Sequence, residues 1–499
     1  MKICRPRTEV RDRNFRTCEH DRSRATWGFA GSCLAGRAAG LFLASSLLLG
    51  CASGNFNQPD NQPITGAPTI VELGERYSPS FGETVIGLSF SGGGMRASAF
   101  AYGIVEEIAS QKVRDDMGGH SLIDNVVFVS GVSGGSVPAA YLALRGAEAV
   151  PAFRDEFLYK NPQSSFNTSV SLGSVFAVLG GGLNNKTGFQ TWLDENLLYG
   201  ATFGDVADRE GAPILWVNAS DVYSDTVFTF DEETFGALCS DLDSFKLSEA
   251  VAAASAVPAV FSPVVIENFA GQCGFEEPAW VSQALVSEES SVVVRNLALA
   301  FRRYQDREQT KFIKLFDGGV TDNLGVHGVI TQRERYGSPI APIDPKQAVG
   351  MKNFLFVVVN AATKTTKDFT TKIEGPNGVA GLGAVLDTLM ATATDRTRDD
   401  FFEAMELWRI DIIEFRCGLS KKRVRELIGD RPGWDCRDVN FDVLDVSFEQ
   451  VTDKSVLTKL EAIPTAYVLP QDQTDLLVKT AGDLLRTNSR YKDFLGRIQ

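Results

Sequence analysis

The fold class depends on one stretch of the sequence, Val126-Val127-Phe128-Val129-Ser130-Gly131-Val132-Ser133-Gly134-Gly135-Ser136. It opens with four apolar, mostly β-branched residues, which favour a buried strand. A helix-like run, residues 137–144, follows directly, and its Pro138 is tolerated because the first helical turn has no internal partner for that N–H. A strand, a tight turn and a helix with serine at the apex form a Gly-x-Ser-x-Gly nucleophile turn. The stretch predicts an α/β fold with Ser133 as nucleophile; an ordinary glycine-rich strand-to-helix loop is the alternative.

A second strand, glycine turn and helix lie just before the first. The apolar residues 85–90 run into Ser-Gly-Gly-Gly-Met-Arg, and apolar residues then recur at helical spacing up to position 108. Glycines at a helix start leave backbone N–H groups free to face an anion. A phosphate-binding loop would usually need Gly-Lys-Ser/Thr, and no lysine is present here. The amides of Gly92, Gly93 and Gly94 are therefore predicted to form an oxyanion hole beside Ser133.

A serine nucleophile needs a base, and the chain has only three histidines. One of them lies in an N-terminal segment that we expect to be removed. His120 precedes the strand that ends at Ser133, so about eight extended residues, roughly 25 Å, separate the two. His327 or a carboxylate remains. The carboxylate in the best position is Asp317, which ends an alternating strand and precedes two glycines, where α/β sites form; the start of an ordinary turn is the alternative.

Three motifs together resemble those of the patatin-like phospholipase family. They are the glycine loop at 92–96, the nucleophile turn at 131–135 and Asp317-Gly318-Gly319, in the family's order. The resemblance covers residues 83–360 well and the segments to 499 more loosely. It implies a three-layer α/β/α patatin-like sandwich with a central, mostly parallel sheet.

The resemblance also implies roles for single residues. Ser133 would be the nucleophile and Asp317 the general base and then the general acid of a Ser–Asp dyad. Gly92, Gly93 and Gly94 would bind the oxyanion, and Arg96 occupies the position of a basic residue that fixes this loop. No cofactor is implied.

The function expected from these motifs is that of a membrane-tethered serine acyl hydrolase of the phospholipase A or lysophospholipase type. Its substrate would be a phospholipid or a lysophospholipid. Two alternatives remain at this point. One is an acyltransferase that uses the same acyl-enzyme, and the other is a catalytically silent lipid-binding lipoprotein.

The N-terminus reads as an export signal. Nine Lys or Arg precede position 38, an apolar run follows, and Leu-Leu-Gly stands directly before Cys51. This pattern matches the bacterial lipobox, so residues 1–50 are predicted to be a lipoprotein signal peptide and Cys51 the acylated residue. Twelve apolar residues are too few to span a bilayer, which favours cleavage. We expect a lipoprotein of the bacterial cell envelope, and Ala52 is compatible with the periplasmic side of the outer membrane.

Composition suggests how the remaining chain is divided. Residues 51–82 contain four prolines and few apolar residues, so they are predicted to be a flexible, lipidated tether. Residues 83–360 would form the catalytic core and residues 361–499 a C-terminal α/β extension of the same domain. Within the extension, strands are expected at 408–415 and 441–448 and helices at 378–407 and 476–495.

Charge excludes one class of partner. The whole chain has 49 basic and 63 acidic residues, a net charge of −14. Residues 1–50 carry nine of the basic and four of the acidic residues, so the mature chain has 40 against 59, a net charge of −19. Such a surface repels phosphate backbones and anionic head groups, so nucleic-acid binding is not expected and membrane attachment would come from the lipid on Cys51.

Four cysteines remain in the chain after Cys51, an even number that permits two disulfides in an exported protein. Proximity in sequence favours Cys239 with Cys273 and Cys417 with Cys436, although three pairings exist. Their spacings do not resemble those of zinc ligands, so no structural metal is predicted.

Overall fold

The computed structural model describes residues 57–65, 82–113, 119–165, 186–258, 260–363, 373 and 378–499. All of them belong to one compact unit, Ser53–Gln499, and the other unit, Met1–Ala52, lies outside the described residues. The predicted signal peptide and the predicted lipidation site Cys51 are therefore not part of the description that follows.

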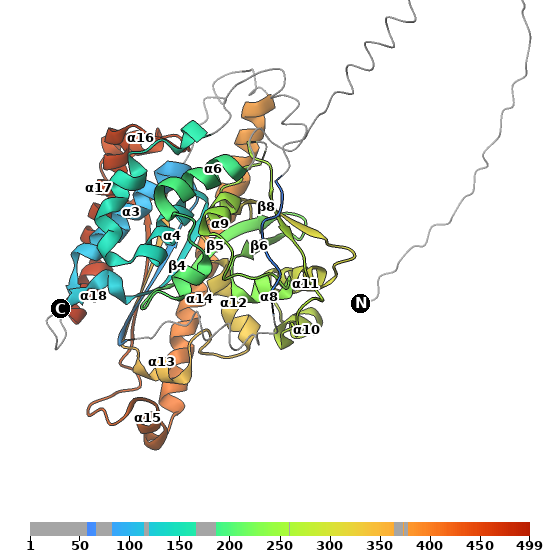
Figure 1. The fold of residues 1–499 in the computed structure, drawn as a ribbon. Helices are drawn as coiled ribbons and strands as arrows, with labels where there is room; N and C mark the ends of the chain where they lie inside the picture. The colour runs from blue at the N-terminus through green and yellow to red at the C-terminus, as the bar shows by residue number, and fades with distance from the viewer. Residues whose placement is uncertain are drawn as a thin grey trace, which may run out of the picture. The chain divides into compact units, whose positions relative to one another are not determined.

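A mixed, mostly parallel sheet forms the centre of this unit (Figure 1). The order of its strands is β10 (Asn440–Ser447), β9 (Asn353–Asn360), β1 (Thr84–Phe90), β4 (Val126–Val132), β5 (Ile214–Asp221), β8 (Phe312–Asp317) and β7 (Val264–Glu267), with β6 (Thr226–Thr229) also paired to β5. The strands from β10 to β5 are parallel, whereas β8, β7 and β6 pair antiparallel. The short strands β2 (Lys112–Val113) and β3 (His120–Ser121) form a separate antiparallel pair.

Apolar side chains alternate between the two faces of the sheet, because successive residues of a strand point to opposite sides. In β9, Leu355 and Val357 belong to one buried cluster, while Phe354 and Phe356 belong to another. Helices cover both faces, which makes three layers. The predicted α/β/α sandwich with a mostly parallel sheet is confirmed.

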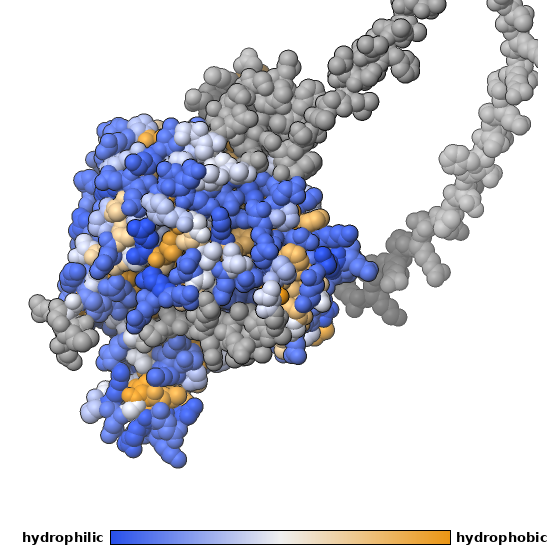
Figure 2. Space-filling view, in the orientation of Figure 1, coloured by the Kyte–Doolittle hydropathy of each residue, from blue (hydrophilic) through white to orange (hydrophobic). Residues whose placement is uncertain are grey.

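The helices of the two outer layers follow from the residues that each cluster contains. The first cluster includes residues of α3 (Gly94–Ser110), α4 (Ser136–Arg145), α6 (Lys186–Leu193), α7 (Phe203–Ala207), α8 (Glu232–Ala237), α9 (Leu247–Ala254), α10 (Ala279–Val286), α11 (Val292–Gln305), α16 (Lys454–Glu461), α17 (Gln471–Thr487) and α18 (Ser489–Ile498). The second includes residues of α12 (His327–Tyr336), α13 (Pro345–Gly350) and α14 (Gly378–Gly418). The short α15 (Lys421–Ile428) follows α14. Hydrophilic residues cover most of the face shown in Figure 2.

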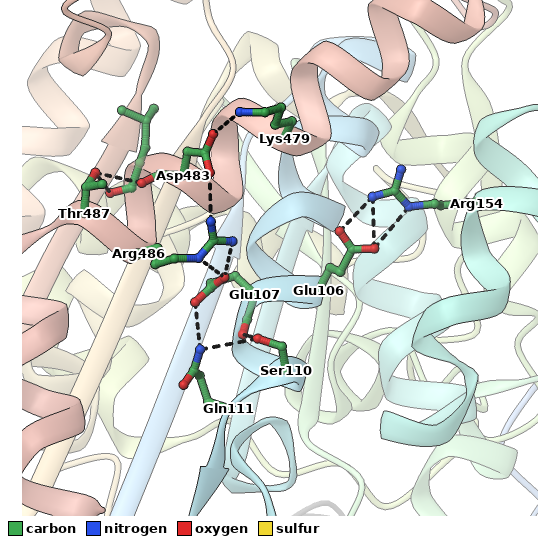
Figure 3. A network of polar contacts seen from close by, with 10 residues as sticks. Glu106, Glu107, Ser110, Gln111, Arg154, Lys479, Asp483, Arg486 and Thr487 are labelled. Atoms are coloured by element: carbon green, nitrogen blue, oxygen red, sulfur yellow. Dashed lines mark hydrogen bonds and ion pairs between the residues drawn. The ribbon is translucent and has the colours of Figure 1, made fainter.

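Helix α17, the last but one in the chain, packs directly on α3, near the start of the fold, as Figure 1 shows. The two backbones approach closely at Gly103, where a Cβ atom would lie 2.3 Å from the carbonyl oxygen of Val478. At the end of α3 the buried carboxylate of Glu107 accepts hydrogen bonds from Arg486 of α17, at 2.6 and 3.0 Å (Figure 3). Residues far apart in sequence are thus held in one layer.

Two expectations for the C-terminal extension need correction. Residues 408–415 alternate apolar and polar like a strand, but they lie within the 41-residue helix α14. Trp408 and Ile412 are buried four residues apart, on one side of that helix, whereas Ile410 is exposed. The single terminal helix predicted at 476–495 is divided at Asn488, whose side chain caps α18 by accepting hydrogen bonds from Arg490 and Tyr491.

The expected flexible tether also needs correction, because residues 57–65 are fixed on the folded unit. Asn57 donates to the carbonyl oxygens of Ser262 and Pro263, and Asn61 both donates to and accepts from the backbone of Glu267. Both asparagine side chains are buried. The low content of apolar residues predicts a flexible segment here, but the side-chain amides bind backbone groups of the folded unit and fix the segment on it. We call residues 57–65 the strap.

Disulfides join Cys239 to Cys273 and Cys417 to Cys436. The first links the end of α8 to the loop after β7, and the second links the end of α14 to the loop before β10. Across the described part of the chain, no helix combines the length and the apolar character needed to cross a membrane.

Candidate active site

The nucleophile turn stands where β4 passes into α4. Ser133 follows the last residue of β4 and has a positive φ of 49°, which is unusual for a residue other than glycine. Such strain is typical of a serine held at a sharp strand-to-helix turn. The hydroxyl of Ser136 donates to the carbonyl oxygen of Ser133 and fixes the turn from the helix side. The Ser133 side chain is thereby held at the end of the sheet.

Asp317 is the last residue of β8, and neighbouring segments fix its backbone. Its N–H donates to the carbonyl oxygen of Ala256 at 2.9 Å, and its carbonyl oxygen accepts from the Ser220 hydroxyl at 2.8 Å. The next residue has to be glycine, because a Cβ on Gly318 would lie 2.1 Å from the carbonyl oxygen of Asn218. The Asp-Gly-Gly sequence therefore lets β8 end directly against β5.

The two side chains meet in a buried hydrogen bond. Ser133 Oγ donates to Asp317 Oδ2 at 2.7 Å, and the N–H of Gly319 donates to Asp317 Oδ1 at 2.8 Å. Burial raises the pKa of Asp317 to about 6, while the hydrogen bonds from Ser133 and Gly319 act in the opposite direction. At neutral pH the carboxylate is ionised and can accept the proton of the serine.

The histidines have other partners. The backbone N–H of His327 donates to Asp322 Oδ2 at 2.7 Å, and its ring Nδ1 lies 4.0 Å from the same oxygen. His120 contacts Asn125 Oδ1 through Nε2 at 2.9 Å. Of the two bases that the sequence left open for Ser133, the structure therefore pairs Asp317 with the serine and places His327 at the start of α12.

In the glycine loop between β1 and α3, the outer amides are bonded and two inner ones have no partner among the described residues. The Gly92 N–H donates to the carbonyl oxygen of Asn323 at 3.0 Å, and the Met95 N–H donates to that of Ala466 at 2.7 Å. Between them, the N–H groups of Gly93 and Gly94 have no hydrogen-bond partner among the described residues. Of the three amides predicted to form an oxyanion hole, that of Gly92 is already bonded, because the loop after β8 passes close to it, and the other two stay a prediction.

The glycine loop and the nucleophile turn are in direct contact. A Cβ on Gly134 would lie 2.0 Å from the carbonyl oxygen of Gly94, and a Cβ on Gly92 would lie 3.2 Å from Ser133 Cβ. Ser98 of α3 donates to the carbonyl oxygen of Gly134 at 2.5 Å and ties the two turns together. The two inner amides are thus held beside the serine by backbone contacts that exclude a side chain.

Arg96, in the first turn of α3, makes hydrogen bonds to two distant segments. Its buried guanidinium donates from Nε to the carbonyl oxygen of Ala361 and from Nη1 to that of Ile463, both at 2.9 Å. These carbonyls belong to the segments that follow β9 and α16. The residue therefore links the start of α3 to two distant parts of the chain.

Sequence reasoning missed the contribution of the segment 463–467. Ile463 and Ala466 act through backbone carbonyls, which every residue type supplies, so no side-chain pattern could indicate them. Tyr467 was also missed, and its hydroxyl donates to the carbonyl oxygen of Ser255 at 2.8 Å. Where the structure describes the chain, no three His, Cys, Asp or Glu side chains gather closely enough to hold a metal ion.

Comparison with known proteins agrees with the motif analysis. Residues 88–330 match the family model for the patatin-like phospholipase and form a patatin-like phospholipase domain, which contains both Ser133 and Asp317. This confirms the resemblance recognised from the three motifs. Among solved structures, human GIVD cytosolic phospholipase A2 is similar at 12% sequence identity, with a TM-score of 0.37, over 85% of this chain and 61% of that chain. No curated protein matches the chain.

Proposed function

We propose that the protein is a serine acyl hydrolase of the phospholipase A or lysophospholipase type that works through a Ser133–Asp317 dyad. The observation that carries this proposal is the 2.7 Å hydrogen bond from Ser133 Oγ to a buried carboxylate, beside two glycine amides that no described residue pairs. The patatin-like phospholipase domain supports a lipid ester as the substrate class.

In the first step the serine attacks the ester. As Ser133 Oγ bonds to the carbonyl carbon, its proton passes to Asp317 Oδ2, which already accepts that hydrogen bond. The carbonyl oxygen takes up the negative charge, and the N–H groups of Gly93 and Gly94 would donate hydrogen bonds to it. The start of α3 at Gly94 adds the positive end of the helix dipole.

In the second step the tetrahedral intermediate collapses. The bond to the alcohol oxygen of the glycerol backbone breaks, and the proton held by Asp317 passes to that oxygen as it leaves. An acyl group remains on Ser133. Water then attacks the acyl carbon and gives a proton to Asp317, and this proton returns to Ser133 Oγ when the fatty acid is released. The carboxylate is regenerated in each turnover.

The membrane attachment of this enzyme is proposed from the sequence. The Leu-Leu-Gly-Cys pattern supports acylation of Cys51 and residence in the bacterial cell envelope, on the periplasmic side of the outer membrane. The acidic chain gives no other attraction to anionic head groups. Incorporation of a labelled fatty acid tests this. Wild type should carry the label and sediment with membranes, and a Cys51→Ala protein that does both would contradict it.

The hydrolase proposal is tested with phospholipid vesicles and a soluble short-chain ester. We expect Ser133→Ala to abolish hydrolysis and Asp317→Asn to lower kcat by about 10³-fold or more, because a general base contributes on that scale. His327→Gln serves as the matched control and should retain activity, since Asp317, and not His327, accepts the hydrogen bond from Ser133. Hydrolysis that survives in Ser133→Ala would refute the proposal. An added alcohol that captures most of the acyl group would identify an acyltransferase instead.

A further inference from the structure

The segment 463–467, between α16 and α17, lies outside the matched family domain and yet completes the site. The carbonyl oxygen of Ala466 accepts the Met95 N–H at 2.7 Å, and it also abuts Gly94, where a Cβ would lie 2.5 Å from that oxygen. The next residue is Tyr467. Because the backbone of Ala466 contacts the glycine loop, it places Tyr467 close to the candidate active site.

The side chain of Tyr467 contacts the segment that fixes the backbone of Asp317. Its hydroxyl donates at 2.8 Å to the carbonyl oxygen of Ser255, and the neighbouring Ala256 carbonyl accepts the N–H of Asp317. Burial and, next, the negative charge of Asp317 raise the pKa of Tyr467, so the phenol stays neutral. Tyr467 thus lies between the glycine loop and the segment 255–256, which holds the backbone of Asp317.

The ring of Tyr467 packs against two buried phenylalanines. Its centroid lies 5.1 Å from that of Phe189 in α6 and 5.8 Å from that of Phe261, both with edge-to-face geometry. We call these three side chains the aromatic wall. Phe189 and Phe261 are buried, and Tyr467 is partly exposed, so the tyrosine ring is the part of the wall that a ligand can reach.

We infer that Tyr467 determines acyl-chain specificity, and that the acyl chain of the ester lies along the aromatic wall during attack by Ser133. This inference rests on the proposed hydrolase function. During attack the ester carbonyl oxygen lies at the amides of Gly93 and Gly94, and the carbonyl carbon lies at Ser133 Oγ. The acyl chain then has to extend past residues that flank the glycine loop and Asp317. Tyr467 follows Ala466, which contacts the glycine loop, and its hydroxyl bonds to Ser255, which precedes the residue that holds the Asp317 N–H. An apolar ring there favours long chains, because each buried methylene increases binding about fourfold.

The test compares kcat/KM for butanoyl, octanoyl and dodecanoyl esters of one chromogenic alcohol. For Tyr467→Ala we expect the dodecanoyl-to-butanoyl ratio to fall about tenfold or more, mainly through KM, the effect of losing contact with two or three methylenes. Tyr467→Phe keeps the ring and should keep the ratio. The matched control is Tyr223→Ala, whose ring is 61% exposed and lies over Lys314.

A second variant covers the case in which Tyr467→Ala does not fold. Tyr467→Trp enlarges the ring beside the chain and should lower the rate for the dodecanoyl ester more than the rate for the butanoyl ester, whereas a loss of folded protein lowers all three rates equally. Equal losses for all chain lengths in both variants, or an unchanged ratio in both, would overturn the inference. Failure of the hydrolase proposal is distinguishable, because wild type and Ser133→Ala would then hydrolyse the butanoyl ester equally.

Discussion

Activity should fall as the pH is lowered through about 6, because the carboxylate of Asp317 becomes protonated. Burial raises the pKa of this carboxyl from 3.8 to about 6, and the general base works only when it is ionised. Below that value the ionised fraction falls tenfold per pH unit, so kcat/KM should drop about tenfold at pH 5 and about a hundredfold at pH 4. A carboxyl with its ordinary pKa would retain most of its activity at pH 5.

The assay is initial-rate hydrolysis of a soluble ester from pH 4 to 8, with circular dichroism to confirm that the protein stays folded. Histidines as a class titrate near pH 6.5, so the same profile is recorded for His327→Gln. We expect the acid limb to keep its midpoint in this variant, because Ser133 is bonded to Asp317 and not to His327. A limb that disappears in His327→Gln, or a wild-type midpoint below about pH 4.5, would refute the reasoning.

Three further perturbations follow from the contacts. Gly134→Ala should cost about 10²-fold or more in kcat, since its Cβ would lie 2.0 Å from a backbone oxygen of the glycine loop, whereas Gly496→Ala, with open space around it, should not. Asp317→Asn should stabilise the protein at pH 8 by up to about 3 kcal/mol in urea unfolding. Because the pKa of Asp317 is raised, the folded state binds the carboxyl proton more tightly than the unfolded state does. The stability that this proton contributes is lost as the pH rises from about 4 to about 6, and the gain from Asn should therefore vanish below pH 4. Lys186→Met should destabilise the protein by about 3–5 kcal/mol, because it leaves the buried Glu249 without its ion-pair partner, and a second change, Glu249→Leu, should recover most of that loss if the pair is what matters.

The parts of the fold that sequence predicted well are those in which local pattern and tertiary position agree. The strand that leads to Ser133 is buried on both faces and is followed at once by its helix, so composition and spacing pointed to the same structure. The same holds for β9, whose continuous apolar run lies between β10 and β1 and is covered on both faces. Glycines marked both turns of the site, because backbone contact there excludes side chains.

The parts that sequence missed depend on contacts between distant residues. The alternation at 408–415 indicated a strand, but the long helix α14 packs this stretch on the second face of the sheet. The strap is held by the buried amides of Asn57 and Asn61. Because these residues are polar, the composition of the segment predicts a flexible chain and not one bound to the domain. The base for Ser133 could be narrowed to His327 or a carboxylate by residue types alone, and the pairing of β8 with β5 brings the carboxylate to the serine.

The most direct measurement is to map the adduct of a fluorophosphonate ester by mass spectrometry of peptides, with the labelling rate followed in parallel. The reagent reacts with a serine whose proton a neighbouring base removes. Wild type should carry one adduct on Ser133, Asp317→Asn should label far more slowly at the same residue, and His327→Gln should label at the wild-type rate. An adduct on another residue, or labelling that does not depend on Asp317, would contradict the dyad.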